Sequence, residues 1–208
     1  MSFELLNYEP PIEEPQAQRK TGARKYTGEN AGDGYRAKRE QSAKWQVEQG
    51  VIEGMLTDLH PGSWVLDVPC GEGRFFDFYH KQGLIFRGVD VEKEQLEAAA
   101  TRVKDPMKAR LIQGDVRAIP CQDKSVDATV MCRITRWLSP EDCKKAFWEA
   151  QRVTRDRIII TARRSGPHAR PVSLFVEALL PDWKLASDTP GYEEDYRILM
   201  FQRDKGEV

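Results

Sequence analysis

Apolar residues follow two different spacings along most of this 208-residue chain. Over residues 45–59 they recur at steps of three and four, which is typical of a helix with one buried face. From residue 63 onward, short continuous apolar runs alternate with stretches of helical spacing. A continuous apolar run predicts a strand covered on both faces, because a half-solvated strand would alternate apolar and polar residues.

Seven of these runs have the length and composition of strands. They cover residues 63–68, 86–91, 109–113, 126–134, 157–162, 183–187 and 196–202, the last two being joined through Thr189-Pro190-Gly191. Helices are expected over residues 35–59, 74–82, 94–103, 139–153 and 172–180. Ser139 and Pro140 form a strong helix start, with Ser as the N-cap and Pro at the first helical position. Alternating strands and helices predict an α/β fold with helices on both faces of a sheet.

The N-terminal residues 1–34 are rich in Pro, Gly, Glu and Gln and have no sustained periodicity. We therefore divide the chain into an N-terminal arm, residues 1–44, and a domain, residues 45–208. Tyr26, Tyr35 and Trp45 are spaced along the basic part of the arm. This spacing favours the interpretation that the arm is a lid, which closes over a bound ligand. Two alternative interpretations of these residues remain. They could belong to a helix that packs on the sheet, or to a basic surface that binds a nucleic-acid phosphate backbone.

The net charge of −1 is an average over segments of opposite sign. Residues 19–44 carry eight basic and three acidic residues, and residues 133–170 carry ten and four. Residues 45–132 instead carry ten basic and fourteen acidic residues. The charge excludes a uniformly polybasic protein, but it allows a negative half of the domain beside a positive rim.

Several classes of protein are disfavoured by what the chain lacks. No apolar run approaches the roughly 18 residues of a membrane helix, and the acidic start has no apolar core of a secretory signal. The four cysteines are irregularly spaced and form no CxxC pair, so we expect neither a metal site nor a disulfide framework. These features predict a cytoplasmic protein with free thiols and no membrane partner.

Candidate chemistry gathers at the ends of the expected strands. Asp67, Asp90, Asp115 and the pair Cys132-Arg133 all fall there. Ligands bind to folds of this kind at the carboxyl ends of the strands, so we expect these residues to line one cleft.

The most specific segment is Asp67-Val68-Pro69-Cys70-Gly71-Glu72-Gly73. Two glycines between a strand and a helix let the backbone approach a ligand closely. A dinucleotide-binding loop would carry a third glycine, but that position is Phe76. The preceding carboxylate, Asp67, is a poor neighbour for a pyrophosphate and a good one for an ammonium group. The ligand predicted by these residues is a nucleoside that carries an amino acid.

Together these residues resemble the signature of the class I S-adenosylmethionine-dependent methyltransferases, over about residues 45–208. The resemblance implies a Rossmann-like seven-stranded sheet, mostly parallel with an antiparallel last strand, and S-adenosyl-L-methionine as the cofactor. It implies that the Asp90 carboxylate binds the ribose hydroxyls and that the Asp115 segment contacts the adenine. The full set of cofactor-binding residues expected from it is Asp67, Cys70, Gly71, Gly73, Asp90, Val91, Asp115, Val116 and Cys132.

Two further residues are candidates for the acceptor side of the site. Arg133 follows the fourth strand and is expected either to touch ligand or to be a solvated surface residue. His168 follows the fifth strand, where an acid/base role competes with a solvated loop position. We treat both as catalytic candidates.

The resemblance predicts methyl transfer to O, N or C of a small acceptor, with an anionic acceptor favoured by the basic segments. The alternatives are an RNA or DNA methyltransferase that uses the basic arm, and a noncatalytic nucleoside-binding or scaffold protein. Cys132-Arg133-Ile134-Thr135 stands where DNA amino-methylating enzymes carry Asp/Asn-Pro-Pro-aromatic, which disfavours that activity. The sequence leaves the acceptor and the oligomeric state open.

Overall fold

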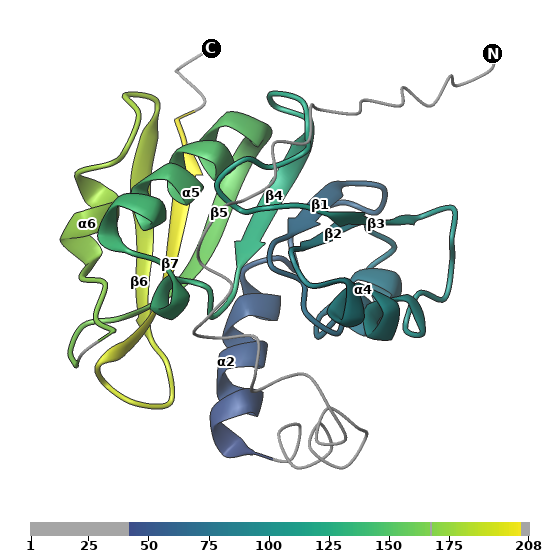
Figure 1. Cartoon of the computed structure of the whole chain (residues 1–208), viewed down its shortest axis with the longest axis horizontal. Coiled ribbons are helices and arrows are strands. Elements are labelled where there is room, and N and C mark those ends of the chain that lie inside the picture. The colour runs from purple at the N-terminus through teal and green to yellow at the C-terminus, as the bar shows by residue number, and fades with distance from the viewer. Residues whose placement is uncertain (1–41, 167, 205–208) are drawn as a thin grey trace.

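The computed structural model describes residues 42–166 and 168–204, which form one sheet flanked by helices (Figure 1). The described strands form a seven-stranded sheet in the order β3-β2-β1-β4-β5-β7-β6. The strands are β1 Trp64–Asp67, β2 Ile85–Asp90, β3 Ala109–Gln113, β4 Val126–Met131, β5 Thr154–Arg163, β6 Trp183–Pro190 and β7 Tyr196–Arg203. Neighbouring strands from β3 to β5 are parallel, and β7 is antiparallel to both β5 and β6. The predicted sheet, mostly parallel with an antiparallel last strand, is confirmed.

Helices cover both faces of the sheet. They are α2 Ala43–Gly54, α3 Phe76–Lys81, α4 Lys93–Ala100, α5 Pro140–Val153 and α6 Val172–Val176, with a 3-10 turn η3 at Thr135–Trp137. One buried cluster joins α5 and α6 to the sheet through Phe147 and Phe175. A second joins α2 and α3 to the opposite face through Ile52, Phe76 and Tyr79. The sheet is buried on both sides, as its continuous apolar strands require.

Local signals account for the starts of two elements. The Ser139 side chain accepts a hydrogen bond from the Asp142 backbone N–H at 3.0 Å, so the predicted N-cap of α5 is confirmed. Asp127 accepts from the Trp64 backbone N–H at 2.8 Å and fixes the beginning of β1 to β4. Asp127, near the N-terminal end of β4, therefore has a structural role.

Several predicted boundaries were wrong, among them those of β4, β6 and the first helix. β4 ends at Met131 instead of Ile134, because the Arg133 backbone takes a left-handed conformation with φ of 62°. β6 continues to Pro190, so this proline lies in a strand instead of a turn. It is tolerated there because β6 is the edge strand of the sheet. The first helix ends at Gly54, before the expected Leu59.

The predicted arm, residues 1–44, lies outside the described residues except for its last three positions. α2 begins at Ala43, so the predicted domain boundary falls in the first turn of that helix. Within the described ranges, no helix has the length and apolar character needed to cross a membrane.

The Phe147 ring tests the packing of α5 on the sheet. Its centroid lies 5.5 Å from that of Phe175 and 4.7 Å from that of Phe201. We expect Phe147→Ala to lower the free energy of unfolding by about 3–5 kcal/mol, because it leaves a cavity in this cluster. Urea unfolding measures this loss, and Phe147→Leu is the control, with a cost below about 1.5 kcal/mol. Equal losses for both variants would contradict the cluster's packing.

Candidate functional site

The carboxyl ends of β1, β2 and β4 meet at one edge of the sheet. In the register of these parallel strands, Asp67 lies beside Gly88 of β2 and beside Val130 of β4. The segments that leave the three strands therefore converge, and they contain most of the residues predicted for the cofactor.

The glycine-rich loop after β1 depends on both of its glycines. Gly71 and Gly73 have φ of 53° and 74°, a left-handed conformation that other residues adopt at a cost. A Cβ on Gly73 would lie 2.5 Å from the Phe76 ring. Phe76, at the position of the missing third glycine, packs on Phe86 with ring centroids 4.4 Å apart. This ring fills the space beneath the loop and keeps the backbone at the edge of the site.

Asp90, at the end of β2, holds the glycine-rich loop in place. One carboxylate oxygen accepts from the Gly71 N–H at 2.9 Å, and the other accepts from the Glu92 N–H at 3.0 Å. Burial raises the pKa of this carboxyl, and the two backbone donors oppose the shift. A carboxylate has about four acceptor positions, so two remain for ligand hydroxyls. Val91 follows and is 47% exposed, which offers an apolar face beside these oxygens.

Asp67 lies beneath the glycine-rich loop and is only 1% exposed. The Tyr79 hydroxyl donates to it at 3.4 Å. Burial raises the pKa of Asp67 to about 8, against smaller opposing effects of Tyr79 and Arg74. The carboxyl is therefore protonated at pH 7 in this geometry. A nearby cation such as an ammonium group would draw it back to the ionised form.

Asp115 and Val116 follow β3, where the predicted adenine contact falls. The Asp115 carboxylate accepts from the backbone N–H of Arg117 at 2.8 Å and pairs with the Arg117 guanidinium at 2.5 Å. Burial alone would raise the pKa of Asp115, but the hydrogen bonds from Arg117 outweigh it and lower the pKa. Val116 is buried in the core. Their contact with adenine stays a prediction.

A buried carboxylate that the sequence analysis did not single out, Glu48 of α2, links the loops of the site. Glu48 is 1% exposed. It pairs with Arg74 of the glycine-rich loop at 2.5 Å and with Arg133 of the turn after β4 at 2.7 Å. It also accepts a hydrogen bond from the Tyr196 hydroxyl on β7. Glu48 occupies a helical position on the same face as Trp45 and Ile52, so a charge in an apolar stripe was the available signal.

The charges around Glu48 keep it ionised. Burial would raise its pKa, but the guanidinium charges of Arg74 and Arg133 and the hydrogen bonds from Arg133 and Tyr196 outweigh burial and lower it. The centroid of the Trp45 ring lies 3.7 Å from the Arg74 guanidinium and 5.2 Å from that of Arg133. Glu48 therefore acts as a counter-ion and fastens α2 over the glycine-rich loop.

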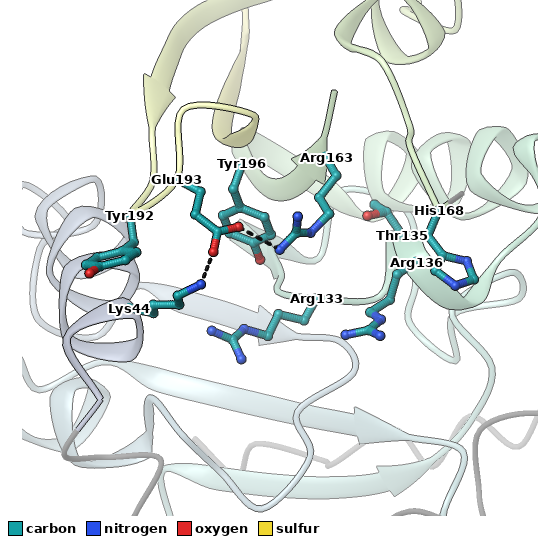
Figure 2. Close-up of a pocket in the computed structure, with 9 residues that line it drawn as sticks. All are labelled: Lys44, Arg133, Thr135, Arg136, Arg163, His168, Tyr192, Glu193 and Tyr196. Atoms are coloured by element: carbon teal, nitrogen blue, oxygen red, sulfur yellow. Dashed lines mark hydrogen bonds and ion pairs between the residues drawn. The ribbon is translucent and has the colours of Figure 1, made fainter. Parts of the chain in front are cut away.

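A pocket of about 150 Å³ adjoins this cluster and shares Arg133 and Tyr196 with it (Figure 2). Its lining residues are Lys44, Arg133, Thr135, Arg136, Arg163, His168, Tyr192, Glu193 and Tyr196. Arg133 and His168, the two acceptor-side candidates, are thus brought together. Cys132 connects the pocket to the loop, since its sulfur lies 3.6 Å from an Arg74 nitrogen. The other lining residues were missed because they come from four separate segments.

Residues 65–157 match a family model described as a methyltransferase domain. The malonyl-(acyl-carrier protein) O-methyltransferase of Hamiltonella defensa is 31% identical over 121 residues, or 58% of this chain and 45% of that protein. The Serratia marcescens protein of the same name is 29% identical over 96 residues, or 46% and 36%. The matched segment thus spans less than half the length of these relatives.

Solved structures share the fold at low sequence identity. Magnesium protoporphyrin IX methyltransferase from Synechocystis PCC 6803 has a TM-score of 0.72 at 12% identity, covering 88% of this chain and 98% of that one. A TehB-like S-adenosylmethionine-dependent methyltransferase from Corynebacterium glutamicum has a TM-score of 0.66 at 19% identity, covering 85% and 97%. The 4+2 cyclase SpnF has a TM-score of 0.65 at 15% identity, covering 80% and 84%.

Residues 65–157 are therefore similar to a methyltransferase domain. The predicted resemblance to the class I S-adenosylmethionine-dependent methyltransferases is confirmed by this match and by the strand order. Because a cyclase is among the structural neighbours, the fold alone does not determine the reaction. The reaction depends on the residues of the site.

The Glu48 cluster predicts a pH-dependent stability. Because the pKa of Glu48 is lower in the folded protein than its ordinary value of 4.5, its ionised form stabilises the fold above that pH. We expect Glu48→Gln to lower the free energy of unfolding by about 2–3 kcal/mol at pH 7, since two guanidinium groups lose their counter-ion. The difference from wild type shrinks as the pH falls below 4.5.

Denaturant unfolding between pH 3.5 and 8 measures this difference. Glu53→Gln is the control on the same helix, because Glu53 accepts a hydrogen bond from Gln49 and contacts neither arginine of the cluster in the described structure. A loss that is the same at every pH would show that Glu48 does not act through its charge.

Proposed function

We propose that this protein transfers a methyl group from S-adenosyl-L-methionine to an O, N or C atom of a small, anionic acceptor. One observation carries the proposal. A glycine-rich loop anchored on Asp90 lies beside a basic pocket, and Cys132 and Arg133 connect the two. In this proposal the glycine-rich loop would hold the cofactor and the pocket the acceptor, in a chain whose residues 65–157 match a methyltransferase domain.

The residues at the edge of the sheet fit the parts of this cofactor. The two free acceptor positions of Asp90 suit the ribose hydroxyls, and the exposed side chain of Val91 suits the face of the adenine. Asp67, beneath the loop, suits an ammonium group, which would favour its ionised form. When bound, S-adenosylmethionine supplies a methyl group on a positively charged sulfur.

The protein's own task in such a reaction is alignment. Displacement at a sulfonium carbon releases a neutral leaving group, so the site needs close approach and exclusion of water more than stabilisation of new negative charge. α2 packs over the glycine-rich loop through the contacts of Trp45 and Glu48 with Arg74. This cover favours both close approach of the reactants and exclusion of water. Glu48 is unsuited to act as a base, because its pKa is lowered and two arginines hold it. His168 is the imidazole in the pocket that could accept a proton from an acceptor.

The relatives favour an oxygen as the methyl acceptor, since two are named as O-methyltransferases. The nucleic-acid alternative rests on the basic residues 19–44, most of which lie outside the described residues. A noncatalytic ligand-binding protein would bind the cofactor without turnover, whereas a methyltransferase would release S-adenosylhomocysteine. We propose a cytoplasmic location, as the sequence suggested.

Asp90 provides the first test of the proposal. We expect S-adenosylmethionine to bind wild type in calorimetry and Asp90→Asn to weaken binding roughly 10- to 100-fold, because a charged acceptor for the ribose hydroxyls is lost. Glu97→Gln, on the exposed face of α4, is the control and should bind as wild type does. Release of S-adenosylhomocysteine in the presence of metabolite pools then tests turnover. If wild type fails to bind the cofactor, the proposal is wrong.

Asp67 predicts that cofactor binding is linked to a proton. Its pKa of about 8 means that the carboxyl is mostly protonated at pH 7, and pairing with an ammonium group ionises it. We expect binding at pH 7 to release about one proton, measured as the dependence of the calorimetric heat on the ionisation enthalpy of the buffer. The release should be small above pH 9 and absent in Asp67→Asn. Unchanged proton release in that variant would exclude Asp67 as its source.

A further inference from the structure

The positive charges of the pocket are not equally neutralised. Lys44 pairs with Glu193, and Arg163 pairs with Glu193 at 3.0 Å and with Asp195 at 3.4 Å. Arg133 pairs with Glu48 at 2.7 Å. Arg136 has no acidic partner among residues 42–166 and 168–204, and its side chain is exposed to the pocket. The lining also contains the imidazole of His168, which can donate a hydrogen bond.

We infer that Arg136 and His168 form an oxyanion subsite that binds a carboxylate or phosphate group carried by the acceptor. The inference rests on the proposed function for the identity of the ligand, because it treats this pocket as the place where the acceptor binds. It goes further in assigning the anionic part of the acceptor to two residues at one end of the pocket.

The position of Arg136 is fixed by the turn that carries it. Its guanidinium lies over the Trp137 ring, 4.9 Å from the centroid. The neighbouring Thr135 hydroxyl donates to the Thr161 carbonyl at 3.0 Å, and the Arg133 N–H donates to the Thr161 hydroxyl at 2.7 Å. The turn is therefore tied to β5 on both sides, so the backbone that carries Arg136 has little freedom to lose on binding.

The two ends of the pocket differ in charge. Figure 2 shows Arg136 and His168 at the same end, with Lys44 and Tyr192 at the other. Glu193 lies toward the second end, where it neutralises Lys44 and would repel an anion. A planar guanidinium donates two parallel hydrogen bonds to a carboxylate or phosphate, and an imidazole N–H adds a third donor. Charge therefore directs an anion to the Arg136 end.

The experiment titrates the full chain, without cofactor, with small anionic probes. Two-dimensional NMR of the indole and arginine N–H groups monitors the binding of each probe. The probes are inorganic phosphate and malonate, each at constant ionic strength, with sodium chloride as the blank. Trp137 and Arg136 report directly on the subsite because they are in contact. We expect one or both probes to bind and Arg136→Gln to weaken binding about tenfold or more. His168→Gln should cause a smaller loss.

Arg110→Gln is the matched control, since Arg110 is exposed on β3, at the far edge of the sheet from β5. It removes the same charge and should leave binding of the probes unchanged. Thermal unfolding of each variant verifies that the fold is kept. Binding of phosphate alone indicates a phosphorylated acceptor, and binding of malonate alone indicates a carboxylic acid. The inference is overturned if neither probe binds, or if Arg136→Gln and Arg110→Gln have equal effects.

Calorimetry with S-adenosylmethionine on the same variants separates this inference from the proposed function. Arg136→Gln should bind the cofactor as wild type does, because Arg136 lies outside the cofactor edge. If wild type binds a probe through Arg136 but not the cofactor, the oxyanion subsite stands and methyl transfer fails. If the cofactor binds and the probes do not depend on Arg136, methyl transfer stands and the subsite is overturned.

Discussion

Two guanidinium groups from different parts of the chain meet on one buried carboxylate. Arg74 comes from the glycine-rich loop and Arg133 from the turn after β4, and both pair with Glu48 of α2. A buried carboxylate is stable only when its charge and its hydrogen-bonding positions are satisfied. Glu48 meets this condition only while all three segments, together with Tyr196 of β7, keep their places. The cofactor edge and the pocket are thereby held in one arrangement.

The distribution of charge around this cluster has a chemical consequence. Asp67 and Asp90 stand on one side of it, at the ends of β1 and β2, and the basic pocket stands on the other. A positively charged cofactor and an anionic acceptor would each find a complementary environment. Methyl transfer would neutralise the sulfonium charge of the cofactor, and it would also neutralise the acceptor's negative charge if the anionic oxygen is the atom methylated.

Much of the fold and of the cofactor edge could be predicted from local patterns. Continuous apolar runs identify the strands because a residue's burial on both faces of a sheet constrains its type. Gly71, Gly73 and Asp90 lie where the loop geometry requires them, within a few residues of strand ends. The strand ends themselves were less predictable. The left-handed backbone at Arg133 stops β4, and no composition signal announces that conformation in a non-glycine residue.

The sequence by itself determined the order of elements, the glycine-rich loop and the acids that follow the strands, because each depends on neighbours close along the chain. Only the tertiary structure decided which side chains surround Glu48 and the pocket. Glu48 meets Arg133 from 85 residues away and Tyr196 from 148. It likewise decided that Arg136 has no acidic partner among residues 42–166 and 168–204, whereas Arg163 pairs with Glu193. Such pairings depend on how the sheet brings distant loops together. The spacing of residues along the chain does not encode which of these loops come into contact.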